Sequence, residues 1–246
     1  MADVNYVILG ATGGIGSETA RRLKAAKAEV FLAGRDEGRL QRLASEIESP
    51  FQVVDATSIE QVERCVNQAT DTMGHVNGIV NCVGSVLLKP AHLTSAAEWD
   101  ETIATNLTSA FATVRAGYKA LRANGGSIVL MSTAAARLGL PNHEAIAAAK
   151  AGVIGLMQSA AASYAARRIR VNAVAPGLVK TGLTERIWSN EKSAEFSRSM
   201  HAIGRLGEPG DVASLIVWLL QPDNNWVTGQ VFGVDGGLGT LRVTGR

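Results

Sequence analysis

The chain has 246 residues, of which 46% are apolar, 19% charged and only 5% aromatic. This apolar content in a chain of this length excludes disordered, collagen-like and small disulfide-rich proteins. The 24 Lys and Arg residues nearly balance the 22 Asp and Glu residues, leaving a net charge of +2. A nucleic-acid-binding protein would normally have a larger, clustered positive excess, so we expect no nucleic-acid partner.

Metal, export and membrane signals are missing from the sequence pattern. The two cysteines, Cys65 and Cys82, form no CxxC pair, and the four histidines never reach HExxH spacing. No apolar run approaches the ~18 residues that span a bilayer. The N-terminus runs directly into a strand without a basic segment or cleavage site. We therefore expect a reduced, cytoplasmic protein with no metal and no membrane partner.

Short β-rich runs alternate with helical stretches along the whole chain. A continuous apolar run, as at residues 6–9, is typical of a strand buried on both faces. Such runs predict seven strands, at residues 6–9, 30–33, 51–54, 78–81, 127–131, 169–174 and 230–234. Helical spacing or propensity predicts helices at residues 15–26, 40–47, 59–72, 99–122, 145–166 and 212–220.

This alternation requires parallel strands joined by right-handed crossovers. No linker, repeat or composition break divides the chain. We therefore expect residues 1–246 to form a single doubly wound α/β domain, with a seven-stranded parallel sheet and helices on both faces. The least regular region, residues 177–207, is either a lid over a cleft or an ordinary surface excursion.

A glycine-rich turn follows the first strand and opens the first helix. Its glycines, Gly10, Gly14 and Gly16, would let the backbone bend tightly and let a phosphate approach the helix N-terminus. Thr12 and Ile15 lie in the same turn. The spacing is GxxxGxG rather than the common GxGxxG, and a purely structural turn is the alternative. Its position between strand and helix favours dinucleotide binding.

The end of the second strand indicates which dinucleotide. NAD sites usually place an acid there for the ribose 2′-hydroxyl, but this chain has Gly34 followed by Arg35. A guanidinium group matches a 2′-phosphate in charge and geometry. The alternative is an exposed arginine that opens the second helix. The pair favours NADP(H).

At this point the motifs resemble the short-chain dehydrogenase/reductase family nearly from end to end. The glycine turn matches its cofactor turn, Asp55 matches the acid that holds adenine, and Asn106 matches its structural and catalytic asparagine. Further matches are residues 81–84, 171–177 with Thr181, 228–230 and 234–237. The cofactor-binding residues that the resemblance implies beyond the turn and Arg35 are Asp55, Ala56, Asn81, Gly84, Lys150, Pro176, Gly177, Val179 and Thr181.

The resemblance implies a Rossmann-type fold, with NADP(H) across the carboxyl ends of the strands and hydride exchange with a small-molecule substrate. Family members are often dimers or tetramers joined through the fifth and sixth helices. We expect a homo-oligomer, a homotetramer being one form. The Ala- and Gly-rich residues 147–155 would allow such close packing, although ordinary helix–sheet packing explains them equally.

The catalytic pattern of the family is broken at one position. The family has a tyrosine four residues before a lysine; here the lysine is Lys150, and Ile146 stands in the tyrosine position. Isoleucine has no proton to donate. The family serine corresponds to Thr133, with Ser132 beside it, so a hydroxyl that polarises a carbonyl remains. Lys150 could hold the nicotinamide ribose or itself act as the acid.

Two ionisable residues upstream are candidate proton donors. His143 could exchange protons at neutral pH, because an imidazole has a pKa near ~6.5. Glu144 could do so only if burial raised its pKa. The alternatives are a polar loop residue or pocket wall for His143 and a favourable first-turn helix charge for Glu144. If the usual loops line the substrate pocket, its apolar residues are Leu87, Leu88, Leu138, Leu140 and Trp188.

The leading hypothesis is an NADP(H)-dependent oxidoreductase with an atypical acid. Its substrate would be a small, largely apolar carbonyl or alcohol, or an activated C=C or C=N compound. Two other classes remain open: a cofactor-binding regulatory or partner subunit without hydride chemistry, which Ile146 motivates, and a non-redox isomerase or lyase on the same fold.

Overall fold

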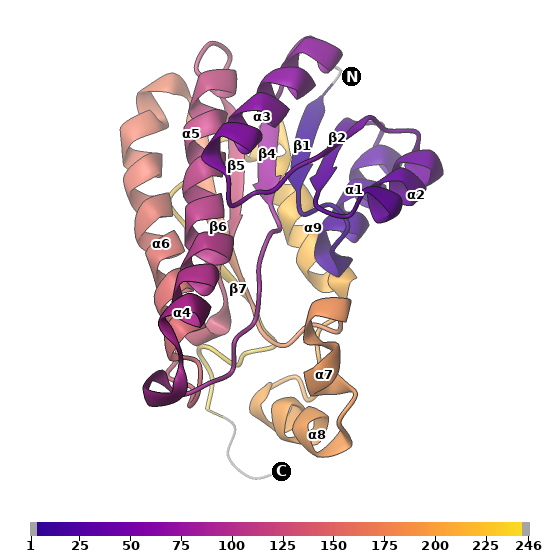
Figure 1. Cartoon of the computed structure of the whole chain (residues 1–246). Helices are drawn as coiled ribbons and strands as arrows, with labels where there is room; N and C mark the ends of the chain where they lie inside the picture. The colour runs from indigo at the N-terminus through magenta and orange to yellow at the C-terminus, as the bar shows by residue number, and fades with distance from the viewer. Residues whose placement is uncertain (1–3, 243–246) are drawn as a thin grey trace.

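A computed structural model describes residues 4–242 of the chain (Figure 1). Within them, one sheet has the strand order β3-β2-β1-β4-β5-β6-β7, with all neighbours parallel. The order reverses between β1 and β4, where ligands bind in open α/β sheets. The doubly wound prediction is confirmed. The strands are β1 (Asn5–Leu9), β2 (Glu29–Gly34), β3 (Phe51–Val53), β4 (Gly78–Asn81), β5 (Gly126–Met131), β6 (Ile169–Pro176) and β7 (Val231–Val234).

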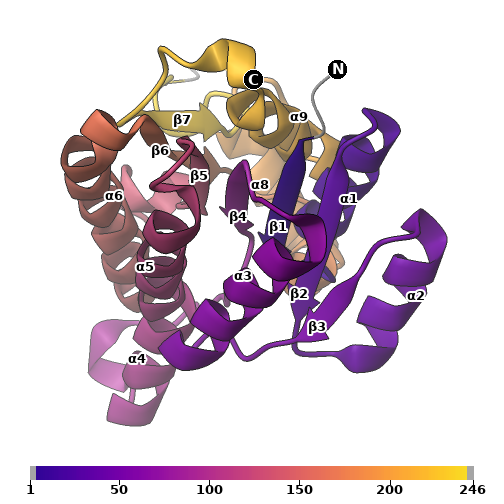
Figure 2. The ribbon, with the colours of Figure 1, turned by 90° about the horizontal axis from the view of Figure 1, so that it is seen from above.

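Helices cover both faces of the sheet (Figure 2). Successive residues of β1 point to opposite sides: Val7 and Leu9 pack into one core cluster, Tyr6 and Ile8 into the other. Helices α3, α5 and α6 supply the first cluster, and α1, α2 and α9 the second. The helices are α1 (Gly14–Ala25), α2 (Glu37–Ile47), α3 (Ile59–Met73), α4 (Ala96–Ile103), α5 (Ser109–Leu121), α6 (Glu144–Tyr164), α7 (Glu185–Trp188), α8 (Glu191–Met200) and α9 (Pro209–Leu220).

Local sequence signals explain where several helices begin. The Asp36 side chain accepts from Arg39 N at the start of α2, and Ser58 accepts from Gln61 N at the start of α3. Ser95 and Glu98 form a capping box that opens α4. Each cap satisfies a backbone N–H that the helix leaves free, which is worth ~1 kcal/mol. The caps therefore fix the residues at which these helices begin.

The helix predicted at residues 99–122 differs from the observed structure. It begins at Ala96 and is interrupted by a π-helical turn, Ala104–Thr108, between α4 and α5. The turn places the Asn106 side chain in the interior. Its Nδ2 donates to Thr102 O and Ser85 Oγ, both at 2.9 Å, and its Oδ1 accepts from Ser85 N. Asn106 thus ties the loop after β4 to the helix pair.

Helix α6 corrects the expectation that no stretch of the chain is long and apolar enough to span a bilayer. Together with the short turn after it, residues 144–167 are long and apolar enough to cross a membrane by length and composition alone. Several of its residues, including Ala149, Val153 and Met157, are instead buried in the core beside the sheet. The apolar composition of α6 is therefore explained by its packing against the sheet, as in the core helix of a globular protein.

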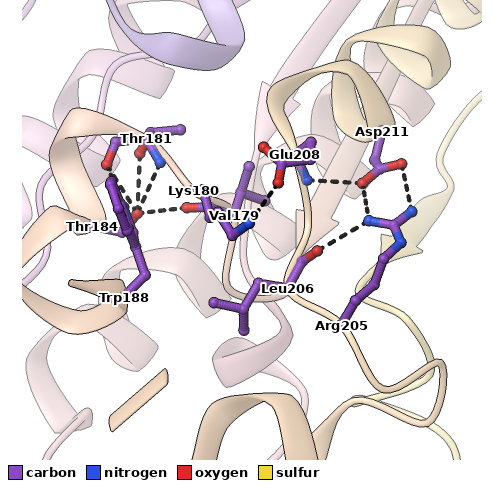
Figure 3. A network of polar contacts seen from close by, with 9 residues as sticks. All are labelled: Val179, Lys180, Thr181, Thr184, Trp188, Arg205, Leu206, Glu208 and Asp211. Atoms are coloured by element: carbon purple, nitrogen blue, oxygen red, sulfur yellow. Dashed lines mark hydrogen bonds and ion pairs between the residues drawn. The ribbon is translucent and has the colours of Figure 1, made fainter. Parts of the chain in front are cut away.

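The segment of residues 177–207 is more regular than expected. It carries α7 and α8, which stand beyond the carboxyl ends of the strands (Figure 1). Both ends of the segment are held near α9 (Figure 3). Lys180 N donates to Gly207 O at 2.8 Å, and Gly207 N donates to Leu178 O at 2.9 Å. Arg205 binds both carboxylate oxygens of Asp211, at 2.6 and 2.9 Å. We call residues 185–200 the α7–α8 lid.

Candidate active site

A groove of about 700 Å³ runs along the carboxyl ends of β1 to β4. Its lining combines the glycine turn, the ends of β2 and β3, and the start of the loop after β4. Seven of the predicted cofactor-binding residues line it: Gly10, Thr12, Gly14, Arg35, Asp55, Ala56 and Gly84. The groove lies at the switch point of strand order, where the fold places a dinucleotide.

Close backbone contacts explain the three glycines of the turn. A Cβ at Gly10, which has a φ of +76°, would lie 2.8 Å from the Cys82 backbone. A Cβ at Gly16 would lie 2.3 Å from Gly10 O, and one at Gly14 would lie 2.7 Å from the Thr181 side chain. Only glycine allows the turn to pack this closely against β4, against itself and against Thr181. The first N–H groups of α1 then face a space shaped for a phosphate.

Two arginines line the far end of the groove. Arg35 is the predicted reader of the 2′-phosphate, and Arg39 was missed; its Nη2 donates to Thr12 O at 2.8 Å. Asp36 also lines the groove, but its Oδ1 accepts from Arg39 N at 2.9 Å as the cap of α2. The capping pattern after the strand would have placed Arg39 on the first helical turn beside the groove.

Asp55 lies at the end of β3 with its carboxylate already oriented. Its Oδ1 accepts from Thr57 N at 3.0 Å and from Thr57 Oγ1 at 2.8 Å. These hydrogen bonds, the backbone one foremost, lower the pKa of the Asp55 carboxyl, and the Arg35 charge adds to the effect. The group therefore faces the groove as a fixed anionic acceptor.

The other predicted cofactor residues lie beneath or beyond the groove. Ile15 packs against the core, and Asn81 is buried, with its Nδ2 donating to Thr113 Oγ1 at 3.0 Å. Val179 is buried in a bridge to Gly207, and Thr181 covers the turn at Gly14. Pro176 and Gly177 line a second cavity.

This second cavity, of about 490 Å³, adjoins the groove. Two chain segments run from one space to the other. In the loop after β4, Val83 and Gly84 line the groove and Val86 lines the cavity. Before α7, Gly182 and Leu183 line the groove and Thr184 lines the cavity. Its walls are mostly apolar and carry no Asp, Glu, Lys or Arg among the lining residues. The apolar pocket is confirmed for Leu88 and Leu140. Leu87, Leu138 and Trp188, predicted with them, do not line it.

The lid supplies part of the cavity wall. Ile187 of α7 and Phe196 and Met200 of α8 line it. These residues were missed because no strand or motif flanks them, and helical spacing alone does not say what a short helix packs against. The observed position favours the lid interpretation of residues 177–207 over a plain surface excursion.

The structure separates the roles of the two adjacent hydroxyl groups. Ser132 Oγ donates to Lys150 O at 3.0 Å and does not line the cavity. Thr133 lines the cavity, and its Oγ1 has only long contacts, 3.5 Å to Pro176 O and 3.4 Å from Ala135 N. Both exceed the usual hydrogen-bond range. Thr133 is therefore the hydroxyl available to a bound molecule.

Lys150 lies buried under Gly84, between the groove and β5. Its Nζ donates to Met131 O at 2.9 Å, and a Cβ at Gly84 would lie 3.6 Å from it. Burial lowers the pKa of the Lys150 ammonium group to about 8. Burial also raises the pKa of the neighbouring Cys82 thiol to about 12.

The proton-donor position is occupied by a buried apolar side chain. Ile146 lines the cavity and is 5% exposed. His143 lines the same cavity, and its Nδ1 lies 2.7 Å from Pro141 O. Because a carbonyl oxygen only accepts, we assign the proton to Nδ1, which leaves Nε2 as the reactive nitrogen. Glu144 is exposed and does not line the cavity. No cluster of three metal-ligating side chains occurs among residues 4–242.

Comparison with known proteins connects this geometry to a family. Residues 10–239 match the family profile described as Enoyl-(Acyl carrier protein) reductase. The 3-oxoacyl-[acyl-carrier-protein] reductase FabG of Thermotoga maritima is 35% identical over 94% of this chain and 96% of its own. This chain belongs to the short-chain dehydrogenase/reductase family. The family likeness extends over the whole fold.

Solved structures of similar proteins superpose closely on this chain. A short-chain type dehydrogenase/reductase from Mycobacterium ulcerans has a TM-score of 0.93 and 31% identity, covering 98% of this chain and 91% of its own. ElxO, solved with NADP bound, has a TM-score of 0.88 and 31% identity, covering 96% of this chain and 98% of its own. A variant of ElxO with one tyrosine replaced by phenylalanine was solved with NADPH bound.

Proposed function

We propose that the protein is an NADP(H)-dependent oxidoreductase that interconverts a small, uncharged, largely apolar carbonyl compound and its alcohol. The observation that carries the proposal is the junction of the dinucleotide groove with an apolar cavity whose lining includes no Asp, Glu, Lys or Arg. Arg35 favours the 2′-phosphate of NADP(H), and the NADP-bound relatives support that choice.

The groove fits this cofactor on its own geometry. Gly10, Gly13 and Gly14 of the glycine turn line it without any side chain, and the Asp55 carboxylate is fixed by Thr57 at the adenine end. Lys150 would hold the nicotinamide ribose from below Gly84. The 2′-phosphate would lie beside Arg35, with Arg39 as a second cation along the same wall. Asn106 and Ser132 act by positioning the loop after β4 and helix α6.

We place the proton donor on His143. NADPH, when bound, supplies a hydride to the carbonyl carbon, and the carbonyl oxygen then needs a proton. The Thr133 hydroxyl donates a hydrogen bond to that oxygen, and a protonated His143 releases its Nε2 proton to it. The ring keeps its Nδ1–H bond to Pro141 O throughout. An acid in this role is worth ~10²–10⁴ in rate.

The test combines cofactor binding with turnover on a panel of C=O, C=C and C=N compounds. We expect tighter binding of NADPH than of NADH, and turnover of an apolar ketone or aldehyde. His143→Gln should lower turnover by ~100-fold or more with unchanged NADPH affinity. Glu144→Gln, the matched control one residue away, should retain wild-type turnover. Full turnover by His143→Gln would contradict the role of His143.

A second candidate function is a cofactor-binding partner subunit, which the buried Ile146 favours because it removes the family's proton donor. NADPH binding without hydride transfer to any compound would support that reading. The variant Ile146→Tyr further distinguishes an oxidoreductase from a cofactor-binding partner subunit. Gained carbonyl reduction would show that Thr133 and Lys150 remain competent and that only the acid is missing.

We also propose that the protein is a homo-oligomer assembled through α5 and α6. Phe111 on the outer face of α5 and Trp99 on α4 are 44% and 43% exposed in the single chain. Exposed large apolar side chains are typical of a subunit interface. A dimer or tetramer would cover them.

A further inference from the structure

His201 occupies a buried position between the lid and the end of β6. It follows α8 directly and is 2% exposed. Its Nδ1 lies 2.6 Å from Ser197 O, inside α8, and its Nε2 accepts from Leu178 N at 3.2 Å. A Cβ on Gly177 would come within 2.5 Å of that Nε2. Glycine at position 177 therefore leaves the space that the ring occupies.

The two partners of the ring define its protonation state. Ser197 O can only accept a hydrogen bond, which assigns the proton to Nδ1. Leu178 N–H can only donate, which requires a lone pair on Nε2. Both contacts form together only with the neutral ring in this tautomer. A second proton would make Nε2 a donor as well. Two N–H donors would then face each other, and the hydrogen bond from Leu178 N would be lost.

The ring lies where loss of the contact would alter the apolar cavity. His201, Ser197 and Leu178 all line it, so the hydrogen bond joins the α8 wall to the wall that β6 supplies. On its other side His201 also lines a separate cavity of about 400 Å³. The ends of residues 177–207 are held independently by the contacts of Lys180 and Arg205 (Figure 3). His201 therefore connects the end of α8 to the residues after β6; we call this pair of hydrogen bonds the tie.

Charged groups approach this region from four elements. On α8, Arg198 is paired with Glu191 and Glu195. Before α9, Arg205 is paired with Asp211 of the first turn of that helix, and after β6, Lys180 is paired with Glu208. After β7, the Asp235 carboxylate accepts from Gly237 N and Gly239 N.

Two further charged or titratable groups approach from the remaining sides. After β5, Arg137 lies near Gly233. Across the cavity, His143 is the other titratable group. The acids in this region accept hydrogen bonds from groups other than the ring, whereas both ring nitrogens contact backbone atoms.

We propose that His201 is a positioning residue that holds α8 against residues 176–178 only while its ring is neutral. Protonation loosens the α8 wall of the cavity. Because the contact needs the neutral ring, it weakens as the pH falls and the ring gains its second proton. The tie involves neither the cofactor nor His143, so it holds whether or not the proposed oxidoreductase function is correct.

The test is amide hydrogen exchange of the intact protein without cofactor, at about pH 5.5 and about pH 8. Rates are corrected for the intrinsic pH dependence of exchange. We expect protection of residues 191–200 and of Leu178 to fall about fivefold to tenfold at the lower pH, as expected for the loss of one hydrogen bond. Protection that does not change with pH would overturn the proposal.

Two variants and one spectroscopic measurement sharpen the result. The Oε1 of His201→Gln can still accept from Leu178 N and gains no proton, so the pH effect should vanish. His143→Gln keeps His201 and should retain it. Because a variant can fold poorly, the wild-type ring is also titrated by NMR. Its midpoint should coincide with the midpoint of α8 loosening; ring titration without any change in α8 would refute the tie.

Discussion

The Lys150 ammonium group is buried beneath the dinucleotide groove, with its Nζ donating to Met131 O. Burial disfavours its charged form, which is why its pKa falls from 10.5 to about 8. The unfolded chain therefore binds more protons than the folded protein between these two values. Folding stability attributable to this residue must rise as pH increases through that window.

The first prediction concerns the substitution Lys150→Met, which removes the charge but keeps the length of the side chain. Relative to this variant, the free energy of unfolding of the wild type should rise by roughly 3 kcal/mol between pH 7 and 10.5. Urea unfolding of both proteins across this range measures the difference. Parallel stability curves would show that the buried amine titrates as in water.

Arg35 carries the choice between the two nicotinamide dinucleotides. Its replacement by alanine should weaken NADPH binding by about 10- to 100-fold, because charge-assisted hydrogen bonds contribute roughly 1.5–3 kcal/mol. NADH affinity should change little. Fluorescence titration of both nucleotides measures the ratio. The control is Arg42→Ala, since Arg42 lies on α2 outside the groove. An equal loss for both nucleotides would contradict the assignment.

Among the elements, the glycine turn between β1 and α1 contains a matched pair of positions. A Cβ at Gly16 would lie 2.3 Å from Gly10 O, whereas one at Gly13 would lie 3.4 Å from the same atom, at an exposed position with φ of −73°. Gly16→Ala should therefore destabilise the fold by about 1–3 kcal/mol and reduce dinucleotide binding. Gly13→Ala should stay within about 0.5 kcal/mol of the wild type. Thermal unfolding and NADPH titration test both.

Elements with strong local signals were predictable. The buried strands read as continuous apolar runs because residues such as Val7 and Ile8 face two different cores. The glycine turn was predictable because strand, turn and helix follow one another. The π-helical turn at Asn106 was not, since its extra residue per turn leaves no period in the sequence. The predicted starts of helices that begin at a cap, such as Ser95, differ from the observed starts by a few residues.

The site was predictable where motifs mark strand ends and not where helices pack. Thr133 and Ser132 are neighbours in sequence, and only the structure shows that one faces the cavity and the other α6. Phe196 lines the cavity from a lid helix whose docking depends on long-range contacts. The role of His201 likewise depends on Leu178, 23 residues away. Such contacts leave no local pattern.

At the scale of the whole molecule, the exposed apolar side chains of α4 and α5 bear on assembly. We expect Phe111→Glu to shift the protein toward smaller species, because a charge buried without a partner in an interface is strongly unfavourable. Light scattering after size exclusion measures the mass. Val53→Glu, at an equally exposed position on the edge strand β3, is the control and should leave the mass unchanged. An unaltered mass for Phe111→Glu would place the interface elsewhere.

Trp188 gives the molecule an optical property of its own. Its indole Nε1 donates to Thr181 O at 2.9 Å, next to the turn at Gly14, and it is the lid's one tryptophan among the chain's four. Tryptophan emission overlaps the absorption of a reduced nicotinamide. In a variant that keeps Trp188 as its single tryptophan, resonance energy transfer should therefore report the distance between lid and dinucleotide in real time, without any attached dye.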